Sequence, residues 1–119
     1  MTFKIIYLDD ESDICEDFAL IMESETIQVI TFNSPLELLQ KIDSIKPDLI
    51  VSDYRMPGLT GIELAKKLSP QLPKVLLTGE LSLKDTSDFV KVFQKPCDFK
   101  TLRNFLYELE AKITKDRAS

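Results

Sequence analysis

Apolar residues along the chain fall into two alternating patterns, short continuous runs and longer stretches with a helical repeat. The runs are five or six residues long and mostly apolar on both faces, which is typical of strands inside a parallel sheet. They cover residues 3–8, 27–31, 49–53, 74–78 and 90–94. The sequence therefore predicts five buried strands.

Between these runs, apolar residues recur at the three- and four-residue spacing of an amphipathic helix. Helices are predicted at residues 12–22, 34–46 and 60–68, and from residue 98 onward. Ser34-Pro35-Leu36-Glu37 and Thr60-Gly61-Ile62-Glu63 both have the pattern of a capping box at a helix start. Residues 82–89 are weakly patterned and form at best a short helix. The polar residues 114–119 are expected to fray as a tail or to begin a linker.

Strand and helix alternate along the whole chain, which predicts a parallel sheet with right-handed crossovers and helices on both faces. This is a three-layer α/β domain. Its 119 residues are enough for one hydrophobic core without disulfides or a structural metal. We therefore expect residues 1–119 to form a single domain.

The composition of the chain argues against several classes of function. The net charge of −5 argues against direct binding to nucleic acid or to an acidic membrane surface, since both need a basic face. No apolar stretch approaches membrane-spanning length and no signal segment opens the chain, so we expect a cytoplasmic protein. Cys15 and Cys97 are too few for a metal framework. We expect both thiols to be reduced and unpaired, with Cys97 the more accessible.

Chemically distinctive residues stand where four of the predicted strands end. Asp9 and Asp10 follow the first strand, Asp53 ends the third, Thr78 ends the fourth and Lys95 follows the fifth. Ligands of open parallel sheets bind beyond these carboxyl ends, so the five side chains are expected at one edge. An acid pair after a strand is, taken alone, more often a helix N-cap region than a metal site. The coincidence of all four strand ends favours a functional site.

The grouping predicts phosphoryl-transfer chemistry. Two carboxylates about 4 Å apart repel by roughly 4 kcal/mol at an effective dielectric near 20, and a divalent cation removes that repulsion. An all-oxygen cluster suits Mg²⁺. A carboxylate such as Asp53 can form an acyl phosphate. The Lys95 ammonium and the Thr78 hydroxyl would then bind the remaining phosphoryl oxygens.

Taken together, these residues resemble the receiver domain of two-component response regulators. The resemblance rests on Leu8-Asp9-Asp10-Glu11, Ser52-Asp53-Tyr54-Arg55-Met56-Pro57-Gly58, Gly61, Leu77-Thr78-Gly79 and Lys95-Pro96, and it extends over residues 3–109. It implies a flavodoxin-like, doubly wound (βα)5 sheet of strand order 2-1-3-4-5. It also implies Mg²⁺ at Asp9 or Asp10, Asp53 and the backbone carbonyl of Arg55.

The resemblance further implies a partner and a mode of action. A sensor histidine kinase or phosphotransfer protein would donate the phosphoryl group to Asp53, and an output domain or partner protein would read the result. Such a domain is a switch that assists its own phosphorylation and dephosphorylation rather than an enzyme. The resemblance also implies a cis Lys95-Pro96 peptide, in keeping with the sharp turn needed to aim the ammonium back at Asp53.

Two features depart from the family pattern. The family usually carries a tyrosine or phenylalanine three residues before the lysine, where this chain has Val92, and Phe93 should face the other side of the strand. The stretch from Thr78 to Lys95 is also shorter than usual by roughly a turn and a half of helix. We therefore expect a weakened or non-standard homodimer, and a switch acting by ordering or displacement of residues 79–89.

Two alternative functions compete with the phosphoacceptor switch. A phosphatase of the haloacid-dehalogenase type needs an acid two residues beyond its nucleophile, and Glu11-Ser12 after Asp10 does not supply that general acid. A binding-only pseudo-receiver would keep the fold as an adaptor and lose the chemistry. The complete set of site residues speaks against this second alternative, and the altered output face keeps it open.

Overall fold

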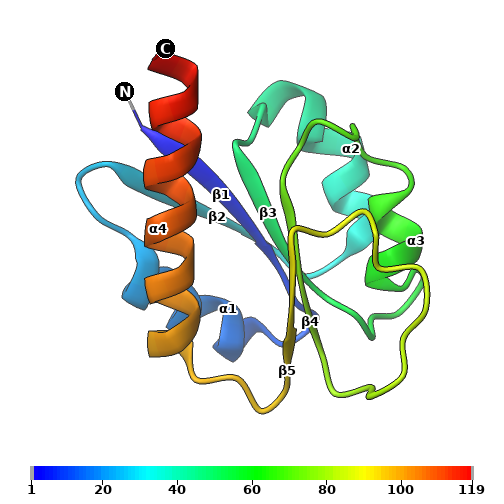
Figure 1. The fold of residues 1–119 in the computed structure, drawn as a ribbon. Helices are drawn as coiled ribbons and strands as arrows, with labels where there is room; N and C mark the ends of the chain where they lie inside the picture. The colour runs from blue at the N-terminus through cyan, green and yellow to red at the C-terminus, as the bar shows by residue number, and fades with distance from the viewer. Residues whose placement is uncertain (1, 119) are drawn as a thin grey trace.

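The structure is a computed structural model that describes residues 2–118, and its centre is a five-stranded parallel sheet (Figure 1). The strands are β1 (Phe3–Leu8), β2 (Ile27–Phe32), β3 (Leu49–Asp53), β4 (Lys74–Thr78) and β5 (Lys91–Gln94). They are hydrogen-bonded in the order β2-β1-β3-β4-β5, which confirms the predicted fold. In this order β1 lies between β2 and β3, with Ile5 opposite both Val29 and Leu49.

Two helices cover each face of the sheet, as Figure 1 shows. The helices are α1 (Ser12–Met22), α2 (Pro35–Ile45), α3 (Gly61–Ala65) and α4 (Phe99–Ala118). Helices α1 and α4 pack on one face, and α2 and α3 pack on the other. Along β1, Ile5 and Tyr7 point to the first face while Ile6 and Leu8 point to the second. This alternation buries both faces of the strand, as its continuous apolar run predicted.

Local sequence signals set the starts of the two helices on the second face. Ser34 caps α2 by accepting a hydrogen bond from the Glu37 amide at 3.4 Å, with Pro35 in the first turn. Thr60 and Glu63 form the predicted capping box at the start of α3, with bonds of 3.1 and 2.9 Å. The regular helix then ends earlier than predicted, at Ala65, and turns continue to Leu68.

The chain between β4 and β5 contains turns and bends and no helix, so four helices, rather than the five of a full (βα)5 repeat, surround the sheet over residues 2–118. This segment, residues 79–90, lies on the α3 side of the sheet (Figure 1). Its large apolar side chains are not buried, and Leu81 is 84% exposed. Without an apolar face to cover, a helix here would gain little from packing.

The last helix, α4, is longer than the sequence predicted. Residues 114–118, expected to fray, continue α4 as regular helix. Arg117 pairs with Asp48 at 2.7 Å and lies over the Phe3 ring, so the last turn is held against the sheet. Basic residues in that turn also complement the negative end of the helix dipole.

Three smaller predictions are confirmed. The Lys95-Pro96 peptide is cis. Cys15 and Cys97 are both free, with Cys15 buried and Cys97 partly exposed. Phe93 packs toward α4 against Phe105, with ring centroids 5.3 Å apart, while Val92 is on the opposite side and 36% exposed.

No helix among residues 2–118 has the length and apolar character needed to cross a bilayer.

Candidate functional site

The sheet brings the predicted site residues to its carboxyl edge. Asp9 directly follows β1, Asp53 and Thr78 are the last residues of β3 and β4, and Lys95 directly follows β5. Backbone hydrogen bonds continue the sheet pattern to this edge, from the Tyr54 amide to the Leu77 carbonyl at 2.9 Å and from the Lys95 amide to the Thr78 carbonyl at 2.7 Å. The positions of these residues are therefore fixed by the register of neighbouring strands.

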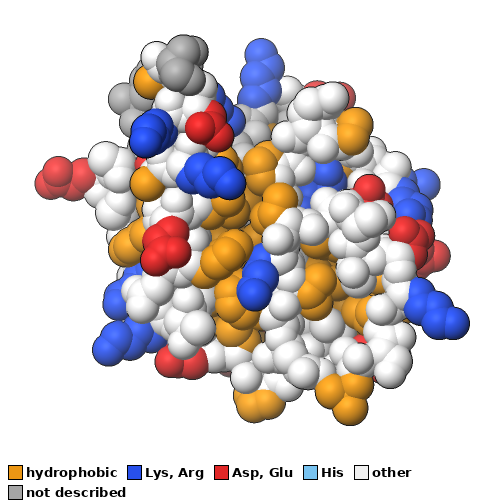
Figure 2. All heavy atoms as spheres, in the orientation of Figure 1, with side chains coloured by type: hydrophobic (Ala, Val, Ile, Leu, Met, Phe, Trp, Pro, Cys, Tyr) orange, Lys and Arg blue, Asp and Glu red, His pale blue; other side chains and the backbone are white. Residues whose placement is uncertain are grey.

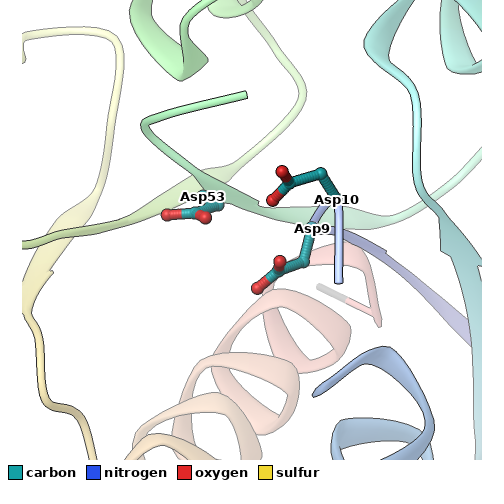
Figure 3. A group of neighbouring side chains, drawn as sticks. All are labelled: Asp9, Asp10 and Asp53. Carbon is teal, nitrogen blue, oxygen red and sulfur yellow. The ribbon is translucent and has the colours of Figure 1, made fainter. Parts of the chain in front are cut away.

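Three carboxylates meet at this edge (Figure 3). One oxygen from each of Asp9, Asp10 and Asp53 lies within 4.8 Å of the others. Asp9 is buried, Asp53 is 7% exposed and Asp10 faces solvent. Figure 3 shows Asp10 and Asp9 projecting from the end of β1 toward the Asp53 side chain at the end of β3.

Four hydrogen bonds fix the position of Asp9. Its Oδ1 accepts a hydrogen bond from the Glu11 amide at 3.0 Å, and its Oδ2 accepts one from the Tyr7 hydroxyl at 3.3 Å. Its backbone carbonyl accepts from Asn33 Nδ2 at 3.0 Å and from the Cys15 thiol at 3.4 Å. Burial raises the pKa of Asp9, and the neighbouring Asp53 raises it further, whereas the Glu11 amide and Lys95 oppose the shift.

Asp53 has one engaged oxygen. Its Oδ1 pairs with Lys95 Nζ at 2.8 Å and accepts a hydrogen bond from the Tyr54 amide at 2.9 Å. Within residues 2–118, no hydrogen bond or ion pair reaches its Oδ2. One oxygen is therefore oriented by the protein while the other is open to a reaction partner.

Gly61 keeps α3 close to the same strand end. Its amide donates to the Tyr54 carbonyl at 2.8 Å. A Cβ at this position would lie 2.7 Å from the Asp53 carbonyl oxygen and 2.7 Å from Leu76 Cδ1. Only glycine fits here without moving the backbone that carries Asp53.

The Thr78 hydroxyl lies at the same edge but is already engaged. Thr78 Oγ1 accepts a hydrogen bond from the Glu80 amide at 2.9 Å. The Glu80 carboxylate in turn pairs with the Arg55 guanidinium, whose Nε lies 2.7 Å from Glu80 Oε1. The use of the Arg55 backbone carbonyl as a metal ligand stays a prediction.

Sequence reasoning missed three residues that contact this site. Tyr7 lies inside β1, Asn33 directly follows β2, and Glu80 follows β4 by two residues. Glu80 had a readable signal, because it stands two residues after Thr78 as the oppositely charged Arg55 stands two residues after Asp53. Tyr7 and Asn33 had none, since their contacts depend on how β1 and β2 end in space.

A cavity of about 690 Å³ opens beside the carboxylates, between α1 and the loop that follows β5. Its walls are largely apolar, with Asp9, Glu11 and Asp17 on the α1 side and Lys95 on the other. The carboxyl edge of the sheet is therefore accessible from solvent beside Asp9 and Lys95.

The residues present fit a hard divalent cation. Three carboxylate oxygens within 4.8 Å of one another make an all-oxygen donor set, and Asp10 keeps that set open to water. Mg²⁺ prefers such donors and retains several water ligands. The Lys95 ammonium, 2.8 Å from Asp53 Oδ1, supplies a positive charge on the same side.

Comparisons with known proteins agree with this geometry. The family model described as the response regulator receiver domain matches residues 5–106. The alkaline phosphatase synthesis transcriptional regulatory protein PhoP of Bacillus subtilis is 39% identical over 67% of this chain and 35% of its own length. The DNA-binding response regulator MtrA of Mycobacterium tuberculosis is 25% identical over 95% of this chain and 50% of its own length.

Solved structures give the same result. A CheY-like response regulator receiver domain protein from Methanospirillum hungatei superimposes with a TM-score of 0.86 at 25% identity, covering 98% of this chain and 99% of that one. The chemotaxis response regulator CheY4 of Vibrio cholerae has a TM-score of 0.77 at 25% identity, covering 91% of this chain and 98% of that one. The chain thus matches whole receiver domains and half or less of the two curated relatives.

Proposed function

Because the chain belongs to the family of response regulator receiver domains, we propose that it is a phosphoacceptor switch whose acceptor is Asp53. The donor is a sensor histidine kinase or a phosphotransfer protein. The observation that carries the proposal is the Asp53 carboxylate itself, with Oδ1 held by Lys95 at 2.8 Å and two further carboxylates beside it. A pair of this kind orients the acceptor and leaves its second oxygen available.

The proposed reaction moves one phosphoryl group. The free oxygen of Asp53 forms a bond to phosphorus as the bond from phosphorus to the donor's histidine nitrogen breaks, and the electron pair of that bond returns to the nitrogen. Lys95 stabilises the negative charge on the phosphoryl oxygens, and the Thr78 hydroxyl donates to another of them. Asp9, Asp10, Asp53 and the Arg55 carbonyl would hold Mg²⁺, which would supply positive charge to offset the carboxylates and the phosphoryl oxygens.

The proposal extends to partners and place. The two curated relatives are named as a transcriptional regulatory protein and a DNA-binding response regulator, and the chain spans 35% and 50% of them. We infer that this receiver, residues 1–119, controls an output domain or a partner protein in the cytoplasm. The net charge of −5 argues that nucleic acid is not bound by the receiver itself.

A phosphodonor assay tests the proposal. Acetyl phosphate with Mg²⁺ should add one phosphoryl group to the chain, and Asp53→Asn should abolish the addition, as followed by intact-protein mass spectrometry. Asp43→Asn on α2 makes the same chemical change away from the carboxyl edge and should be labelled normally. Undiminished labelling of Asp53→Asn would refute the assignment of the acceptor. A wild-type chain that takes no label even in the presence of Mg²⁺ would point instead to the binding-only adaptor.

A further inference from the structure

The loops that leave β3 and β4 are joined across the acceptor site by a charged pair. Arg55 lies two residues after Asp53, and Glu80 lies two residues after Thr78. Because β3 and β4 are neighbours in the sheet, both loops start at the edge that carries Asp53. The Arg55 guanidinium donates to Glu80 Oε1 through Nε at 2.7 Å and through a terminal nitrogen.

Glu80 also holds the second group that flanks Asp53. Its amide donates to Thr78 Oγ1 at 2.9 Å. Glu80 therefore engages both the Thr78 hydroxyl at the end of β4 and the Arg55 guanidinium two residues after the acceptor. Within residues 2–118, neither Arg55 nor Thr78 makes a side-chain hydrogen bond to Asp53 in this state.

We propose that Arg55 is a further phosphoryl-binding residue, held by Glu80 before phosphorylation and transferred to the phosphoryl group on Asp53 afterwards. This inference rests on the proposed function. A phosphoryl group replaces a single negative charge by about two and presents several acceptor oxygens. The planar fork of arginine binds such oxygens in pairs, more strongly than it binds in an exposed ion pair. The Arg55 and Glu80 side chains are 78% and 37% exposed, so their pairing is readily exchanged.

The exchange would release one attachment of residues 79–90. That segment has no helix, and two other attachments join it to α3, from Lys66 Nζ to Asp85 at 2.7 Å and to Asp88 at 3.5 Å. Figure 2 shows side chains of both charges gathered over α3 and this segment. Loss of the Arg55 pair frees the part next to the site, residues 79–84, while residues 85–90 stay tied to α3.

Binding of beryllofluoride, a phosphoryl mimic, in the presence of Mg²⁺ tests the inference in the full chain. Arg55→Gln should weaken binding about tenfold, the effect of losing one charge-assisted hydrogen-bonded contact, and Arg55→Lys should fall between it and wild type. Glu80→Gln keeps the amide that donates to Thr78 Oγ1 and removes the negative charge that holds Arg55, so it should tighten binding. The double variant should behave like Arg55→Gln alone. Lys66→Gln, which cuts the other attachment, should bind like wild type.

Amide hydrogen exchange supplies an independent readout. Beryllofluoride should increase exchange in residues 79–84 of wild type and leave that segment unchanged in Arg55→Gln. Wild-type affinity in Arg55→Gln, or weaker binding in Glu80→Gln, would overturn the inference while Asp53 labelling by acetyl phosphate continued. Loss of Asp53 labelling in the wild-type chain would instead overturn the proposed function, and this inference with it.

Discussion

The carboxylate of Asp53 differs between its two oxygens, and that difference comes from single side chains. Lys95 Nζ lies 2.8 Å from Oδ1, and the Tyr54 amide donates to the same atom at 2.9 Å. Lys95 thus offsets part of the repulsion among three carboxylates and also fixes the direction of the acceptor. A cation placed in advance stabilises charge that develops on the phosphoryl group without reorganising at the moment of reaction.

Replacing Lys95 should therefore slow phosphorylation more than it affects folding. We expect Lys95→Gln to lower the rate of labelling by acetyl phosphate on the order of 10²-fold, the usual effect of removing one preorganised charge-stabilising donor. Thermal stability should fall as well, because Lys95 offsets the repulsion among the carboxylates, but solvent screening of a side chain that is 34% exposed limits this loss. Lys91→Gln removes the same charge from the exposed start of β5 and should be labelled at the wild-type rate. Equal effects of the two changes would show that only net charge matters.

The residues of the site differ in how far sequence could place them. Asp9, Asp53, Thr78 and Lys95 were predictable because each stands at a strand end, and the topology of a parallel sheet then brings them together. Glu80 lies two residues beyond a strand end, and its spacing from Thr78 hints at a pair with Arg55 without specifying the path of the loop. Its contacts with Arg55 and Thr78 therefore required the structure.

Among the elements, those with a local signal were predicted and those determined by distant contacts were not. The capping box at Thr60 and the apolar stripe of α4 are local features, and both are present. The helical residues 114–118 include Arg117, which pairs with Asp48, 69 positions away in the sequence. The small number of residues between β4 and β5 was visible in the sequence. The charged pairs that join residues 79–90 to the end of α3 could not be predicted from it.

The junction between β3 and α3 gives a prediction at this scale. Gly61→Ala places a methyl group 2.7 Å from the Asp53 carbonyl oxygen, so α3 or the end of β3 must move. We expect a loss of about 1–3 kcal/mol in the free energy of unfolding, as for other overpacked sites, together with slower labelling of Asp53.

Denaturant unfolding and acetyl phosphate labelling measure the two effects. Gly79→Ala is the matched control, because a Cβ there has no atom within 4 Å and the backbone has no positive φ. We expect the control to change unfolding by only a few tenths of a kcal/mol. Similar losses at both glycines would show that the close approach of α3 is not the cause.

For the molecule as a whole, the acid cluster links metal binding to stability. Three carboxylates and one ammonium give the carboxyl edge a local charge of about −2, on a chain whose net charge is −5. Folding brings these carboxylates together, and unfolding separates them. A cation that binds only the folded cluster must therefore stabilise the native state.

We expect Mg²⁺ at ten times its dissociation constant to stabilise the fold by about 1.4 kcal/mol, or on the order of 5 °C in Tm. Scanning calorimetry with increasing MgCl₂ measures this shift, with NaCl of equal ionic strength as the control for screening. Asp10→Asn should reduce the shift, because it removes one of the three carboxylates. Asp10 is the member of the cluster that faces solvent. An equal shift with NaCl would mean that general screening, rather than a bound cation, is responsible.

The missing helix between β4 and β5 also has a consequence for the order of folding. In most crossovers of a parallel sheet a helix forms locally and shortens the search for the next strand, but residues 79–90 supply no such intermediate. β5 is short, largely exposed and bonded only to β4, so we expect β5 and α4 to join the sheet last. Lys95 arrives with them. A newly synthesised or partly folded chain would then carry Asp53 without its cation, and fast acceptance of a phosphoryl group would report that folding is complete.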